Sequence, residues 1–143
     1  MPRVPAKKFG EVYRPVVVIQ LVLPNGRTWF TPAIVDSGAD ETILPASILA
    51  SHEVTWESLD RPDSAFLHGV GGRVERRSCP AATRYRGSVF GTKVTVVREL
   101  RFPVVGRSDF FRTFRVDFSR WDEEPPGLEI DERPPKRATG PRE

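Results

Sequence analysis

Cysteine is nearly missing from this chain of 143 residues, which contains only Cys79. One cysteine excludes an intramolecular disulfide and cannot supply the pair of thiolates that many structural metal sites use. Chains without disulfides are typical of reducing compartments, because disulfides persist mainly in oxidising ones. We therefore expect a cytoplasmic protein without a structural metal site.

Long apolar runs are missing as well. No segment reaches the ~18 apolar residues of a membrane-spanning helix. The apolar run Val16–Leu23 is interrupted by Gln20 and is followed by Pro24-Asn25-Gly26. That pattern predicts a strand and a turn rather than a signal peptide, so no membrane partner is expected.

The residue patterns of nucleophilic and zinc hydrolases are scarce too. The chain has two histidines, His52 and His68, and neither shows the spacing of a catalytic triad or of a zinc site. A thiol nucleophile made by Cys79 with a histidine is an alternative, although a solitary cysteine is more often a small buried apolar residue. No Gly-x-Ser-x-Gly frame surrounds Ser37, Ser78 or Ser108.

Charge is present in quantity and is unevenly distributed. The net charge is +3, and residues 122–143 hold seven acidic and four basic side chains, a net −3 that leaves +6 on the rest. Basic residues interleave with aromatic ones in segments such as residues 111–115, as they do on some nucleic-acid-binding surfaces. Alternating charge on strands is more typical of a solvated face, so no nucleic-acid partner is expected and nucleic-acid binding is kept as an alternative.

Composition divides the chain into three parts. Its length and its 38% hydrophobic content suit one globular core, which we assign to residues 11–121 and in which we find no internal repeat. Residues 1–10 predict a flexible N-terminal arm. Residues 122–143 are rich in proline and charge with little to bury, which predicts a disordered tail.

The central part has the pattern of a mostly β domain, because short runs rich in β-branched residues alternate with turn signals. The Asn-Gly pair within residues 24–26 suits a hairpin, since both residues tolerate positive φ. Residues 69–72 predict the turn of a second hairpin. Short helices are expected at residues 45–53 and 108–114, the second capped by Ser108 with Asp109 in its first turn. Expected strands are residues 14–23, 27–35, 64–68, 73–78, 83–87, 92–100 and 116–118.

The segment AIVDSGADETILP, residues 33–45, places a carboxylate at the end of an apolar run. A charge is costly to bury there, so its presence needs a reason. Asp-Ser-Gly alone is common turn chemistry, but three further features follow it in order: the glycine-rich LHGVGGRV, the apolar-glycine PVVGR, and the capped helix. A phosphate-binding loop is a poor alternative for the glycine-rich stretch, because no Gly-Lys-Ser/Thr follows it.

These motifs, taken in this order, resemble the signature of the retropepsin family, the single-domain aspartic proteases of retroviral type. The resemblance spans residues 16–118. It implies a mostly β, closed acid-protease barrel with a flap hairpin and one or two short helices. It also implies an aspartic endopeptidase that acts on polypeptide substrates as a homodimer, without a cofactor.

The resemblance implies a catalytic role for each residue of the Asp-Ser-Gly motif. Asp36 would face Asp36 of a second chain, and the two carboxylates would share one proton and activate a water molecule as general base and general acid. Ser37 would form a hydrogen bond across the dimer. Gly38 would leave room for the water molecule and the substrate backbone.

Substrate-binding positions are implied on both sides of the expected cleft. Ala39 and Asp40 would line it, with Asp40 paired to Arg107, while Glu41 is either a contact to a substrate side chain or an exposed acid. The segment Val104–Gly106 would pack beneath the catalytic aspartate. The flap would contribute the positions His68, Gly69, Val70, Gly71 and Gly72. Of these, the histidine departs from the apolar residue that the family pattern predicts.

The dimer contact and the activity itself each leave an alternative. Retroviral relatives interleave their chain ends in a small sheet, but the proline-punctuated arm and the charged tail of this chain depart from that pattern. We therefore expect dimer contacts through the Ser37 region and the flaps, or through a tail that orders on association. A non-catalytic, dimeric peptide-binding module of the same fold is the alternative to a protease.

Overall fold

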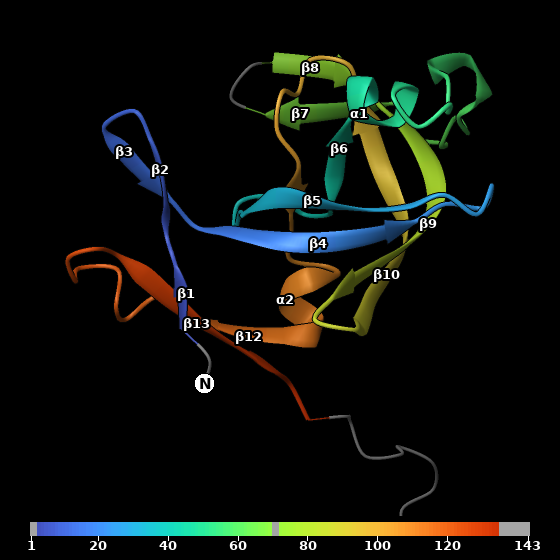
Figure 1. The fold of residues 1–143 in the computed structure, drawn as a ribbon. Helices are drawn as coiled ribbons and strands as arrows, with labels where there is room; N and C mark the ends of the chain where they lie inside the picture. The colour runs from blue at the N-terminus through green and yellow to red at the C-terminus, as the bar shows by residue number, and fades with distance from the viewer. Residues whose placement is uncertain (1–2, 70–71, 135–143) are drawn as a thin grey trace, which may run out of the picture.

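Six strands close into a barrel that forms the body of the protein (Figure 1). The computed structural model describes residues 3–69 and 72–134. The order around the barrel is β10-β6-β11-β5-β4-β9. The bounds of these strands are β4 Val16–Val22, β5 Thr28–Val35, β6 Ile43–Pro45, β9 Arg77–Tyr85, β10 Ser88–Val97 and β11 Val104–Val105. The expectation of a mostly β chain with a closed barrel is confirmed.

The antiparallel hairpin of β4 and β5 leads the chain to the Asp-Ser-Gly motif. Its register pairs Val17 with Ala33, and both side chains are buried in the barrel. Of the Asn-Gly pair in the turn, only Gly26 has a positive φ, 85°. The side chain of Asn25 instead accepts a hydrogen bond from the backbone N–H of Arg27 at 2.9 Å. The predicted turn is therefore present, with positive φ at one residue rather than two.

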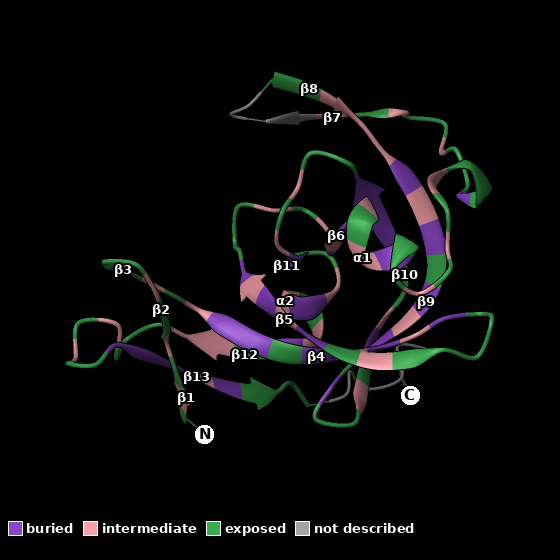
Figure 2. Ribbon diagram, turned by 45° about the horizontal axis from the view of Figure 1, so that its top comes forward, coloured by how far each residue is buried: buried purple, intermediate pink, exposed green. Residues whose placement is uncertain are grey.

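Two clusters of buried side chains fill the interior. Buried residues lie along the barrel strands and along α2, Phe110–Thr113 (Figure 2). In the first, Phe110 is fully buried and packs edge-to-face on Tyr85 and Phe90, with ring centroids 5.6 and 5.1 Å apart. Such aromatic pairs add specific geometry to the area that they bury. The second cluster centres on Leu44 and Leu49, which are both fully buried.

Both predicted short helices are present, as α1, Ala46–Ala50, and α2, Phe110–Thr113. The 3₁₀ turn η1, Trp56–Ser58, was not predicted. The predicted cap at Ser108 is wrong: Asp109 is the N-cap, and its side chain accepts a hydrogen bond from the N–H of Phe110. Ser108 belongs to the connection before the helix, where its backbone N–H donates to the carbonyl oxygen of Asp40 at 2.7 Å. No helix within residues 3–69 and 72–134 is long and apolar enough to cross a bilayer.

The two chain ends form a sheet together, which overturns two predictions. β1, Arg3–Pro5, pairs antiparallel with β13, Gly127–Glu132, and β13 pairs with β12, Phe114–Asp117. The disordered tail predicted from residue 122 onward is therefore wrong for residues 122–134, and residues 135–143 lie outside the described part. The flexible arm is likewise wrong for residues 3–9, which contain β1 and β2, Lys7–Phe9, the latter paired with β3, Val12–Arg14.

Burial explains why composition failed at the C-terminal end. Leu128 is fully buried and Ile130 is 2% exposed, and both belong to the cluster around Phe110. These two residues are spaced by two, so a strand presents both to the core. Averaging over a charged, proline-rich segment conceals such a short alternating pattern.

Ile130→Val is expected to lower the free energy of unfolding by about 1 kcal/mol, because it removes a buried methylene from a packed strand. Urea denaturation measures the difference. Val18→Thr is the matched control, since Val18 lies on the exposed side of β4 with 56% of its surface accessible. Equal stability of the wild type and Ile130→Val would contradict the packing of β13.

A separate hairpin follows the helical turns. β7, Phe66–Gly69, pairs antiparallel with β8, Gly72–Glu75, with Leu67 opposite Val74. The second predicted hairpin is thus confirmed. In both views the strands β7 and β8 lie outside the barrel (Figures 1 and 2).

Candidate active site

Asp36 begins the loop that joins β5 to β6. Val35 before it is 4% exposed, whereas Asp36 itself is exposed in the single chain. Its N–H donates to the carbonyl oxygen of Val105 at 3.0 Å, so the backbone is held to β11 up to the aspartate. The carboxylate therefore stands at the end of a buried strand, as the sequence indicates, but its side chain is not buried in one chain.

The motif folds into a tight turn around this carboxylate. The N–H of Gly38 donates to Oδ1 of Asp36 at 2.9 Å, and the N–H of Ala39 donates to the Asp36 carbonyl oxygen at 3.1 Å. A Cβ atom at position 38 would lie 3.2 Å from that same Oδ1. Ser37 and Gly38 are both exposed and Ala39 is partly buried. The turn thus presents the carboxylate of Asp36 and the hydroxyl of Ser37 to solvent, and the hydrogen bond from Gly38 restrains the orientation of the carboxylate.

The segment Val104–Gly106 supports this turn from beneath. β11 pairs parallel with β5, with Val105 opposite Val35, and antiparallel with β6. A Cβ atom at Gly106 would meet the carbonyl oxygen of Ala39 and both N and O of Glu41 at 2.7 Å. The backbone of the Asp36 loop therefore lies directly on Gly106, and the predicted packing beneath the aspartate is confirmed.

The predicted contact between Asp40 and Arg107 is also confirmed. The two side chains form an ion pair, with Nη2 of Arg107 donating to Oδ1 of Asp40. The backbones are joined as well, since the N–H of Arg107 donates to the carbonyl oxygen of Ala39 at 2.9 Å. Both side chains are more than half exposed, so the pair orients the loop rather than contributing much to stability.

The hairpin positions are only partly described. The backbone of His68 pairs with Arg73, and that of Gly69 pairs with Gly72, whose φ is 94°. Val70 and Gly71, the predicted tip residues, lie outside the described residues. The structure therefore places the predicted flap strands but does not test the contacts proposed for these glycines.

Two solved structures resemble this architecture. The EIAV protease complexed with the inhibitor HBY-793 matches with a TM-score of 0.52 and 22% identity, over 71% of this chain and 88% of that chain. A retropepsin-like aspartic protease from Rickettsia conorii matches with a TM-score of 0.53 and 14% identity, over 90% of this chain and 99% of that chain. The chain has the retropepsin fold. No family model and no curated protein matches the sequence.

Within the retropepsin fold, sequence reasoning assigned Asp109 only to the first turn of a helix. Its carboxylate also bridges two segments, since Oδ2 accepts a hydrogen bond from the N–H of Thr42 at 3.1 Å. Asp109 thereby joins the start of α2 to the end of the Asp36 loop. Its place directly before an apolar helical pattern is the one signal in the sequence for capping, and nothing in the sequence marks the contact to Thr42.

Sequence reasoning also missed the partner of Glu41. Nη1 of Arg76 lies 2.7 Å from Oε1 of Glu41, and the two side chains are 20% and 26% exposed. Neither of the two roles weighed for Glu41, a substrate contact or a free acid, included this ion pair. The partners are 35 positions apart in the sequence, so no local pattern predicts the pair.

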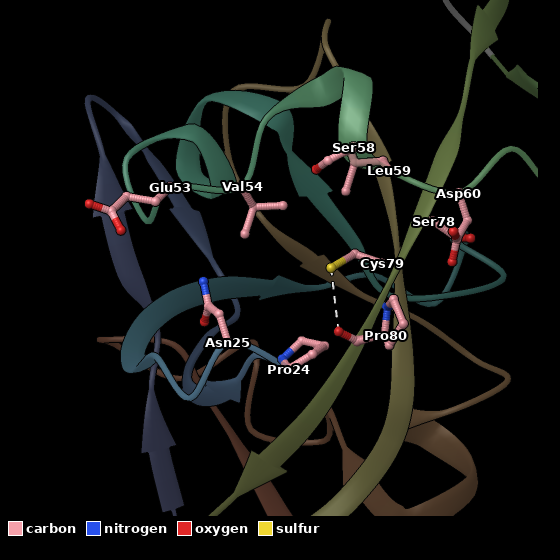
Figure 3. Close-up of a pocket in the computed structure, with 10 residues that line it drawn as sticks. All are labelled: Pro24, Asn25, Glu53, Val54, Ser58, Leu59, Asp60, Ser78, Cys79 and Pro80. Atoms are coloured by element: carbon pink, nitrogen blue, oxygen red, sulfur yellow. Dashed lines mark hydrogen bonds between the residues drawn. The ribbon is translucent and has the colours of Figure 1, made fainter.

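A separate cavity of about 280 Å³ contains the one cysteine (Figure 3). Burial raises the pKa of the Cys79 thiol, and the negative charge of Asp60 raises it further. The thiol lies 3.3 Å from the carbonyl oxygen of Pro80, while His52 stacks on Trp29 with ring centroids 3.7 Å apart. These contacts disfavour a cysteine–histidine nucleophile, because only the thiolate is reactive.

Among residues 3–69 and 72–134, no group of three or more His, Cys, Asp or Glu side chains is arranged to hold a metal ion.

Proposed function

We propose that the protein is an aspartic endopeptidase whose active site forms when two copies bring their Asp36 carboxylates together. The observation that carries the proposal is the position of Asp36, exposed at the end of β5 on a turn that rests on Gly106. The Asp40–Arg107 pair beside it supports the same assignment. Two of the solved structures that share the fold bear the names of proteases, which favours peptide-bond hydrolysis.

The mechanism follows from placing two like charges together. Two carboxylates at close range do not both ionise, so the pair of Asp36 residues holds one proton. The ionised carboxylate takes a proton from water, the resulting hydroxide oxygen bonds to the peptide carbonyl carbon, and the protonated carboxyl donates to the carbonyl oxygen. The diol then collapses, the C–N bond breaks, and the leaving amine takes up a proton. No metal and no covalent intermediate is needed.

The neighbouring residues hold this pair in place. The N–H of Gly38 already restrains Oδ1 of Asp36, which limits the directions in which the carboxylate points. Ser37, exposed beside it, forms the hydrogen bond across the dimer. Asp40, Ala39 and the β7–β8 hairpin line the substrate site.

Dimer contacts run through the Asp36–Gly38 turns and the hairpins. β1 and β13 pair with each other within one chain, so the chain ends are not free to interleave as single strands. A tail that orders only on association is not required over residues 127–132, because they form β13 in a single chain. Since Cys79 is the only thiol, we place the protein in the reducing cytoplasm.

Dilution tests the shared site. We expect cleavage of a casein-like substrate per chain to fall in parallel with the dimer fraction, because the folded monomer holds half of the catalytic groups. Mass photometry and cleavage assays on the same dilution series measure the two quantities. Undiminished cleavage by a strictly monomeric chain would refute the proposal. Peptide binding without turnover by the dimer would instead favour the non-catalytic module.

A further inference from the structure

We propose that Arg76 is a positioning residue that sets the β7–β8 hairpin relative to the Asp36 loop through its ion pair with Glu41. The kinetic consequence rests on the proposed protease function. The structural consequence does not, because the contacts exist in the single chain without substrate.

Arg76 ties together the two ends of the hairpin. It directly follows β8, and its N–H donates to the carbonyl oxygen of Ala65, the residue before β7, at 2.8 Å. Its Nε donates to the carbonyl oxygen of Ser64. The guanidinium therefore lies across the base of the hairpin, where it is bound to the backbone that leads into β7.

The remaining arm of the guanidinium reaches the active-site loop. Nη1 donates to Oε1 of Glu41 at 2.7 Å. Glu41 is itself firmly placed, because its backbone N and O both lie against Gly106 and the next residue, Thr42, donates its N–H to Asp109. A hairpin tied to Glu41 is thus tied to the rigid part of the Asp36 loop rather than to a free side chain.

Partial burial makes this pair stronger than a surface ion pair. The side chains of Arg76 and Glu41 are 20% and 26% exposed, against 60% and 80% for Arg107 and Asp40. Charge-assisted hydrogen bonds that are shielded from water are screened less by salt and have a defined geometry. The Arg76–Glu41 pair is therefore able to hold a fixed distance between two elements.

Two other arginines near the base of the hairpin have different partners. Arg77 and Arg98 both lie near Glu75, at 3.5 and 3.1 Å, and both cover the ring of Trp56. Their partners are Glu75 and Trp56, and neither of these belongs to the Asp36 loop. Among the ion pairs of the described residues, Arg76–Glu41 is the one that joins hairpin base and Asp36 loop. Arg98 thus provides a matched control: an arginine at the same base with a different anchor.

The expected effect is on substrate binding more than on chemistry. Without the pair, the hairpin samples positions that do not complete the substrate site. The apparent affinity for substrate then falls in proportion to the fraction of molecules whose hairpin is in the binding-competent position. Once substrate is bound and the hairpin is placed, the Asp36 carboxylates are unchanged. KM should therefore rise while kcat changes little.

The kinetic test compares Arg76→Met, which keeps an apolar stem, with Arg98→Met. We expect Arg76→Met to raise KM about fivefold or more with kcat within about twofold, and Arg98→Met to alter neither by more than about twofold. Glu41→Gln breaks the pair from the other side and should reproduce the Arg76→Met effect. The exchange Arg76→Glu with Glu41→Arg should recover at least part of the loss, which a merely structural arginine would not allow. Equal KM values for Arg76→Met and Arg98→Met would overturn the proposal.

A second measurement does not depend on catalysis. Amide hydrogen exchange of residues 66–69 and 72–75 should be about fivefold faster in Arg76→Met and Glu41→Gln than in wild type and Arg98→Met, at equal melting temperature. Unchanged exchange in both variants would refute the positioning role even if the protein is a protease. Faster exchange in a protein that cleaves nothing would uphold it and refute the proposed function alone.

Discussion

Asp36→Asn is expected to lower kcat/KM for peptide cleavage by at least about 10³-fold, because an amide can neither accept a proton from water nor donate one at neutral pH. The loss should appear mainly in kcat. Steady-state cleavage of a fluorogenic peptide, measured at concentrations where the dimer is complete, gives both parameters. The change affects both halves of the site at once, since each copy supplies one Asp36.

The fold should survive this substitution. Asp36 is exposed, and its side chain accepts a hydrogen bond from the N–H of Gly38, which the amide oxygen of asparagine also accepts. The melting temperature and the dimer fraction of Asp36→Asn are therefore expected to match the wild type. Asp63→Asn is the control, because Asp63 is an exposed aspartate elsewhere on the surface. Activity retained in Asp36→Asn, or lost equally in Asp63→Asn, would rule out the assignment of Asp36.

Gly106→Ala is expected to destabilise the protein by about 3 kcal/mol, the upper range for forcing an extra methyl into a packed interior. The new Cβ would lie 2.7 Å from the carbonyl oxygen of Ala39 and from N and O of Glu41. All three are backbone atoms, and the loop that holds them is pinned by the Asp40–Arg107 pair and by Asp109. The backbone cannot yield without displacing Asp36. Urea denaturation measures the loss.

Gly38→Ala separates this packing effect from an effect at the catalytic group. The Cβ at position 38 would meet one atom, Oδ1 of Asp36, at 3.2 Å, and that atom belongs to an exposed side chain that can turn away. We expect a stability change of less than about 1 kcal/mol together with a clear loss of activity, as the carboxylate is redirected. Comparable stability of Gly106→Ala and the wild type would contradict the close approach of the two loops.

Local patterns in the sequence were enough to predict much of the architecture. Runs rich in β-branched residues predicted β4 and β5, the Asn-Gly signal predicted the turn between them, and helical spacing of phenylalanines predicted α2. Such signals act within a few residues of one another, so they can be recognised without knowing the fold. The Asp-Ser-Gly, glycine-rich and apolar-glycine motifs, taken in order, predicted the retropepsin fold and the Asp40–Arg107 contact through their resemblance to the family.

Other features depended on contacts between distant segments. β13 lies in a tail whose composition predicts disorder, and it is ordered because Leu128 and Ile130 enter the core beside Phe110. The contacts of Thr42 with Asp109 and of Glu41 with Arg76 likewise join residues that are far apart in the sequence, so no local pattern predicts them. Sequence therefore determined the strands and helices that carry a local pattern, together with the residue that is the candidate catalyst. Tertiary packing alone decided what holds that residue in place, because burial and ion pairing depend on neighbours that come together only in the folded chain.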